Sequence, residues 1–183
     1  VSIGDQAFAN CPNMTQVSIP ATVTTLGSGV FKNCANITDF VFEDGTSFPS
    51  LGTGFFSGMT KLQRVKLPSD LTAIDKQCFY NCKALEYVDM PTTVKSIGEE
   101  AFYGCTALKD FEIPANVRSL GTRAFYGCTS LKDMSIPATV TSIGERAFYN
   151  CKGLTEINFL PYTGKGETPT LVIKGEAFRG TKI

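Results

Sequence analysis

Seven cysteines and 17 acidic side chains are the groups that could do chemistry in this 183-residue sequence, which contains no histidine. Without histidine, the Ser-His and Cys-His nucleophile pairs, the usual general base and every His-containing zinc or haem site are excluded. Paired carboxylates could serve a glycosidase, but no cleft is expected that would desolvate one of them and raise its pKa. We therefore predict no enzyme activity, no catalytic residue and no cofactor.

Most of the cysteines occupy one position of a repeated pattern, so they should lie along one buried line. We expect them to be small apolar side chains that close the end of a short helix. A ladder of disulfides is disfavoured by the odd number of cysteines and by the spacing expected on that side of the fold. Cys78 and Cys82 could suggest two ligands of a metal ion, but the sequence offers no two further ligands near them. The recurrent cysteines are Cys11, Cys34, Cys82, Cys105, Cys128 and Cys151.

The charge balance and hydropathy exclude two classes of partner. Seventeen basic residues match 17 acidic ones, and the pI is about 6.5, so the sequence lacks the basic surplus that broad nucleic-acid binding requires. No stretch approaches the ~20 consecutive apolar residues of a membrane span. We predict no nucleic-acid partner and no membrane insertion in this segment.

A repeat positions these side chains. Phenylalanine recurs eight times with gaps of mostly 23 residues, an apolar residue stands five positions before it, and Asn or Gly stands two positions after it. The apolar spacing around the Phe predicts a helix of about two turns, which Asn or Gly would end in the left-handed conformation. Apolar residues six, nine and eleven positions past the Phe then predict a short strand that ends at a proline. The phenylalanines are Phe8, Phe31, Phe56, Phe79, Phe102, Phe125, Phe148 and Phe178.

One such unit cannot bury its apolar face alone, whereas stacked units form a continuous core. The sequence therefore predicts an α/β solenoid with parallel strands on its concave face and short helical turns on its convex face. We expect a single domain over residues 1–183 of about eight units, with a loop insertion at 160–170. Both ends fall inside a repeat without a polar capping unit, so we also expect a fragment whose caps are missing.

The pattern I-G-x-x-A-F-x-x-C-x-x-L-x-x-V-x-I-P-x-x-V, seen from Ile97 to Val117, resembles the 23-residue leucine-rich repeat of the BspA-like family. These are surface proteins of bacteria and protists. The resemblance covers nearly the whole chain and implies a right-handed, open-ended solenoid from a secreted or cell-surface protein. It also implies adhesion to host matrix or to other cells, and it supplies no catalytic residues.

Strand positions that face away from the core form the predicted concave surface. There a basic spot is followed by an acidic stripe beside one exposed tyrosine, and like charges ~5 Å apart repel unless something compensates them. A cationic partner or a divalent ion would compensate, and a solvated face is the alternative. We predict a monomeric interaction module that binds a protein or glycan on a host or neighbouring cell, or else a structural spacer that displays another domain. The candidate contact residues are Arg64, Lys66, Tyr87, Asp89, Asp110, Glu112, Asp133 and Glu156.

Overall fold

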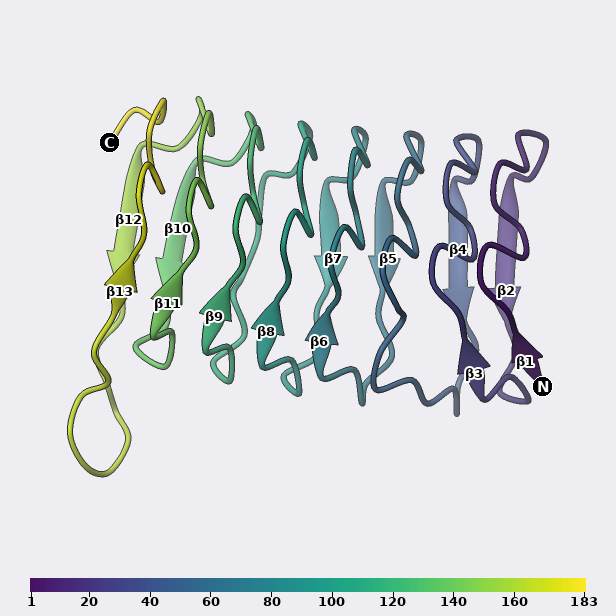
Figure 1. Cartoon of the computed structure of the whole chain (residues 1–183), viewed down its shortest axis with the longest axis horizontal. Helices are drawn as coiled ribbons and strands as arrows, with labels where there is room; N and C mark the ends of the chain where they lie inside the picture. Colours follow the sequence, from purple (N-terminus) through teal and green to yellow (C-terminus); the bar gives the residue numbers. More distant parts are fainter.

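The computed structural model describes residues 1–183 as a solenoid of stacked coils, shown from end to end in Figure 1. The stacked coils form a wall of longer strands, a wall of two-residue strands and a region of tight turns. The longer strands are β2 (Gln16–Ile19), β4 (Asp39–Phe42), β5 (Arg64–Lys66), β7 (Tyr87–Asp89), β10 (Asp133–Ile136) and β12 (Glu156–Phe159). The shorter strands are β1 (Ser2–Ile3), β3 (Thr25–Leu26), β6 (Ala73–Ile74), β8 (Ser96–Ile97), β9 (Ser119–Leu120), β11 (Ser142–Ile143) and β13 (Val172–Ile173).

All strand pairs are parallel, and most of them join residues 23 apart. Asp133 pairs with Glu156 in β10 and β12, and Ser96 pairs with Ser119 in β8 and β9. This register turns each repeated position of the sequence into a straight column along the solenoid. Five of the two-residue strands form a sheet in the order β13-β11-β9-β8-β6, and the other two pair as β1-β3. The longer strands pair as β2-β4, β5-β7 and β10-β12.

The recurrent phenylalanines form one file inside the solenoid, as the repeat predicts. Rings of successive coils stack with centroids 4.8 to 5.3 Å apart, and their planes are within 8° of parallel. Phe55 interrupts the file between Phe31 and Phe56, because its ring packs edge-on against both. The buried apolar side chains form one continuous cluster of 45 residues, so the chain has a single core.

The predicted two-turn helices are wrong, because the structure contains no helix. The residue two positions before the core phenylalanine has a positive φ, for example 56° at Gln77 and 54° at Glu100, and such a residue cannot continue a right-handed helix. The backbone bonds to the next coil instead. The N–H groups of Gln77, Phe79 and Asn81 donate to carbonyl oxygens one coil later, at 2.9, 2.7 and 2.7 Å. The solenoid is therefore built from strands and turns only.

The Asn or Gly two positions after each phenylalanine does adopt the left-handed conformation that the sequence indicates. Its φ lies between 58° and 78° in all eight coils. The wall of two-residue strands, in contrast, was expected only as a return path. Its sequence signal is a small residue, usually Ser or Thr, followed by the Ile or Leu that precedes the turn.

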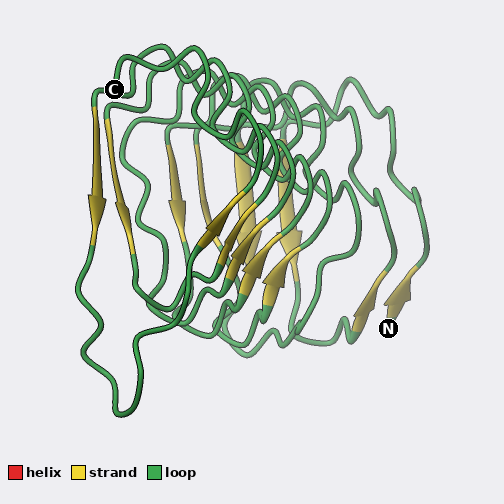
Figure 2. Ribbon diagram, turned by 60° about the vertical axis from the view of Figure 1, so that its left-hand side comes forward, coloured by secondary structure: helices red, strands yellow, loops and turns green.

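Residues 160–170 form a long loop between β12 and β13 that projects away from the solenoid (Figure 2). A second insertion, near Gly45, folds back onto the core instead. It buries Phe48, whose backbone N–H donates to the Asp70 carboxylate at 3.0 Å. The two insertions thus leave the stack continuous while changing its outline.

Candidate interaction surface

The outward-facing positions of the longer strands form what we call the long-strand face. Side chains alternate along each of these strands, so Tyr87 and Asp89 of β7 point outward while Val88 is buried between them. All eight residues singled out from the sequence are exposed on this face. Six of them come from strands β5, β7, β10 and β12, and Asp110 and Glu112 come from the segment between β7 and β10.

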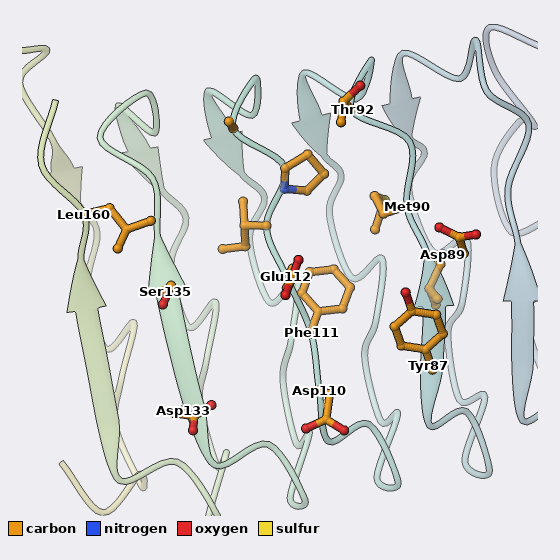
Figure 3. Close-up of a pocket in the computed structure, with 14 residues that line it drawn as sticks. Tyr87, Asp89, Met90, Thr92, Asp110, Phe111, Glu112, Asp133, Ser135 and Leu160 are labelled. Carbon is orange, nitrogen blue, oxygen red and sulfur yellow. The ribbon is translucent and has the colours of Figure 1, made fainter. Parts of the chain in front are cut away.

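A groove of about 730 Å³ lies on the long-strand face between β7 and β12 (Figure 3). Its floor includes Phe111 and Ile113, and Leu160 closes the side nearest the projecting loop. Arg64, Lys66 and Glu156 lie outside it. Five of the eight candidate residues line the groove, namely Tyr87, Asp89, Asp110, Glu112 and Asp133.

The side chains of the eight candidate residues have no polar partners within the molecule. None of the six ion pairs and none of the side-chain hydrogen bonds involves any of the eight residues. The register places Lys66 beside Asp89 and places Asp133 beside Glu156. The first pairing offsets part of the charge, whereas the second juxtaposes two carboxylates, which is unfavourable by a fraction of a kcal/mol, of the order of 0.5 kcal/mol.

No three acidic or cysteine side chains converge closely enough to hold a metal ion. The spread-out carboxylates of the groove therefore fit a cationic group on a larger partner better than a bound divalent ion. Divalent ions such as Ca²⁺ require six or more oxygen ligands around one point.

The backbone at the centre of the groove belongs to no sheet. Residues 109–113 share no backbone hydrogen bond with β7 or β10, so their peptide groups are left open between two paired sheets. The ring of Phe111 packs edge-on against Phe102 and Phe125, with both centroid distances 4.9 Å. The ring alone does not explain the gap in the ladder, because Phe40 occupies the same position of the repeat in β4 and is paired with Val17 of β2.

Two features of this surface were not found from the sequence. Leu160, which is 44% exposed, replaces a proline of the repeat and reaches the rim of the groove. The open peptide groups of 109–113 could not be found either, because the strand pattern there is as regular as in its neighbours. For Leu160, the sequence signal was the absence of the proline that most repeats have at this position.

The cysteine column is structural. All seven cysteines are free, and six are buried. The Cys105 thiol donates to the carbonyl oxygen of Phe79 in the preceding coil at 3.1 Å, and Cys34, Cys82, Cys128 and Cys151 make the equivalent bond at 3.0 to 3.2 Å. Each of these thiols therefore ties two coils together, which explains a cysteine at a position where alanine would also fit.

Burial of these thiols makes stability depend on pH in alkaline solution. Desolvation raises the pKa of Cys82 from 9.0 to about 12, so in the unfolded chain this thiol loses its proton at lower pH. Between those two values the unfolded state binds fewer protons, and the free energy of unfolding must fall as pH rises. We predict that Cys82→Ala makes this fall shallower by up to about 1.4 kcal/mol per pH unit.

Urea unfolding at a series of pH values from about 8.5 to about 11 would measure this slope. Tyrosine ionisation contributes equally to both proteins and cancels in the comparison. Parallel curves for Cys82→Ala and the parent chain would contradict a buried neutral thiol at this position.

A second column of aromatic side chains lies along the turn region. The rings of Tyr80, Tyr103, Tyr126 and Tyr149 stack with centroids 4.7 to 5.0 Å apart. Desolvation and the adjacent Tyr126 and Tyr80 raise the pKa of Tyr103. Packing between coils accounts for this column.

The fold and this surface define a leucine-rich-repeat solenoid with a continuous core and an open, charged long-strand face. The chain matches the BspA type leucine-rich repeat region in six copies, over residues 1–132 and 72–183. It therefore belongs to the BspA-type leucine-rich-repeat family, as the resemblance of its repeat indicated. Proteins built from such repeats typically act as surface proteins and protein-interaction modules.

Solved structures of bacterial leucine-rich-repeat proteins are similar to this chain. The leucine-rich repeat protein TpLRR of T. pallidum is 25% identical with a TM-score of 0.61, over 80% of this chain and 64% of that one. The pneumococcal vaccine antigen PcpA is 24% identical with a TM-score of 0.54, over 85% of this chain and 47% of that one. The chain thus spans less than two thirds of the length of either protein.

No curated protein sequence matches the chain. Nor does any segment of the chain form an apolar helix of the length that crosses a bilayer.

Proposed function

We propose that this chain is a non-enzymatic interaction module of a secreted or cell-surface protein, which binds a protein or glycan partner through its long-strand face. The observation that carries the proposal is the groove between β7 and β12, where four acidic side chains and Tyr87 are exposed and unpaired. The family supports the same role, because its repeats serve as interaction modules.

The groove favours a partner that presents positive charge. Asp89, Asp110 and Asp133 come from three successive coils, so a partner lying along the solenoid axis could contact all of them at once. Tyr87, which is 45% exposed, adds a rigid amphipathic side chain of the kind that dominates binding energies at interfaces. The scaffold is formed before binding, and little conformational entropy is lost when the partner docks.

A charge-reversal pair tests this proposal. We expect Asp110→Lys combined with Asp133→Lys to abolish binding of the chain to immobilised extracellular-matrix proteins and to glycans that carry amino groups. Raised salt should weaken the parent interaction, since exposed charges are screened within ~8 Å at physiological ionic strength. Surface plasmon resonance at two salt concentrations would measure both effects.

The matched control is Asp44→Lys combined with Glu167→Lys, which changes the net charge equally at exposed positions outside the groove. If this control weakens binding as much as the groove variant does, the groove is not the binding site. Ligands that bind both variants as tightly as the parent would favour the structural spacer instead.

A further inference from the structure

A row of lysines follows the edge between the turn region and the long-strand face. They stand four or seven positions past the core phenylalanine, on five successive coils, and all are exposed. We call this row the lysine edge. It consists of Lys83, Lys109, Lys132, Lys152 and Lys182.

The lysine edge forms few ion pairs. Only Lys109 forms an ion pair, with Glu86 at 3.1 Å, and no other lysine of the row takes part in one. In a protein with zero net charge, such a row is a local concentration of positive potential, and it attracts anions even though the whole chain does not.

A concavity of about 430 Å³ lies within this edge, and its lining contains no apolar side chain. Lys182 reaches it because the last residues fold back onto the preceding coil, where the Lys182 N–H donates to the carbonyl oxygen of Leu154 at 2.9 Å. Apart from Gly153, the lining consists of Lys109, Lys132 and Lys182 with the hydroxyl residues Thr129, Ser130 and Thr155.

The hydroxyl groups of the concavity are arranged to accept hydrogen bonds. Thr155 donates its proton to the carbonyl oxygen of Lys132 at 3.2 Å, and Thr129 donates to that of Thr106 at 3.4 Å. The free lone pairs of both oxygens can then accept from hydroxyl groups of a ligand. Ser130 makes no hydrogen bond within the chain and can donate or accept.

We propose that the lysine edge binds a sulfated linear polysaccharide. Lysine ammonium groups act as point charges for sulfates spaced along a chain, while Thr129, Thr155 and Ser130 contact the sugar hydroxyls between them. The row runs along the solenoid axis, so successive sulfates meet successive coils.

A nucleic acid fits this edge less well. Single strands bind by stacking their bases on aromatic side chains, and the lining of the concavity has none. Asp110 and Asp133 directly follow Lys109 and Lys132 and point onto the long-strand face. These carboxylates border the row and repel any polyanion that extends beyond a single narrow chain.

Binding of the 183-residue chain to a size-defined heparin oligosaccharide tests the proposal. We expect Lys132→Glu combined with Lys182→Glu to weaken binding at least about tenfold, and to reduce the slope of log K against log salt by about one to two. Lys132→Arg combined with Lys182→Arg should retain most of the affinity, because the charge is kept. Lys32→Glu combined with Lys95→Glu is the matched control, since it makes the same change of net charge at exposed positions away from the edge.

Two further probes separate the sources of negative charge. Thr155→Val should weaken heparin binding and leave binding of inorganic polyphosphate unchanged, because polyphosphate has no sugar hydroxyls. If Lys132→Glu combined with Lys182→Glu loses no more heparin affinity than the matched control does, the lysine edge is not the binding site. Tighter binding of a single-stranded oligonucleotide than of heparin would overturn the assignment to a polysaccharide. This site is separate from the groove, so Asp110→Lys combined with Asp133→Lys should not weaken heparin binding.

Discussion

Replacing Phe125 with alanine is expected to lower the free energy of unfolding by about 3–5 kcal/mol. Phe125 has no exposed surface and stacks on Phe102 at 5.2 Å and on Phe148 at 5.1 Å. Phe111 packs edge-on against the same ring at 4.9 Å. The substitution removes the contacts of all three neighbours and leaves a cavity that the surrounding backbone cannot close, because it is bonded from coil to coil.

Phe8→Ala is the matched control for this prediction. Phe8 occupies the same column in the first coil, but it is 39% exposed and stacks on one ring only, Phe31 at 5.3 Å. We expect it to cost roughly 1–2 kcal/mol. Urea unfolding followed by circular dichroism would give both values, and equal losses at the two positions would contradict a file of rings whose interior members carry the stability.

The position of Phe125 within the stack should also affect how the chain unfolds. Coils of a solenoid contact only their neighbours, so stability is a sum over coils and over the interfaces between them. A weakened interface in the middle allows the two flanking parts to unfold separately. A broader or biphasic transition in Phe125→Ala, absent in Phe8→Ala, would be the sign of this uncoupling.

The sequence was sufficient to predict the stack because its columns repeat in eight coils. A phenylalanine every 23 residues requires the rings to align, and an Asn or Gly two positions later marks the left-handed residue that ends the turn. These requirements are local, and the sequence of each coil contains the residues that meet them.

The missing helices were hard to predict from the residue types, because only two of the eight coils have a glycine, Gly29 or Gly54, at the left-handed position before the phenylalanine. The residue that breaks the helix is Gln77, Glu100, Arg123 or Arg146 in successive coils, and none of these residue types favours a positive φ. The strain is offset by backbone hydrogen bonds to the next coil, such as that from the Glu100 N–H to Thr122 at 2.9 Å. Only the stacked structure contains those bonds.

The candidate surface was predictable in composition and less so in shape. Alternation along the strands placed all eight charged or aromatic residues outside the core, and the structure brings five of them to one groove. The groove itself depends on the segment 109–113, which joins no sheet although its apolar pattern is as regular as in the neighbouring coils. A one-dimensional pattern does not contain that information.

Gly121→Ala is expected to destabilise the chain by about 3 kcal/mol, at the upper end of the usual cost of overpacking. A Cβ atom at Gly121 would lie 2.5 Å from the carbonyl carbon of Gly98 and 2.6 Å from the backbone N of Glu99. Both atoms belong to the backbone of the preceding coil, so no side chain can rotate away, and the two coils must separate. That separation would strain the bond from the Gly121 N–H to the carbonyl oxygen of Ile97, now 2.8 Å.

Gly127→Asn, six residues further along the same coil, distinguishes close approach from backbone conformation. Gly127 has a φ of +70°, and an added Cβ would meet nothing within 4 Å. Asparagine already occupies the equivalent position at Asn81 and Asn150, both with a φ of 58°. We therefore expect a change within about 0.5 kcal/mol. Thermal or urea unfolding of both variants measures the difference in stability. If Gly127→Asn loses as much stability as Gly121→Ala, the close approach of neighbouring coils is not the reason for glycine at position 121.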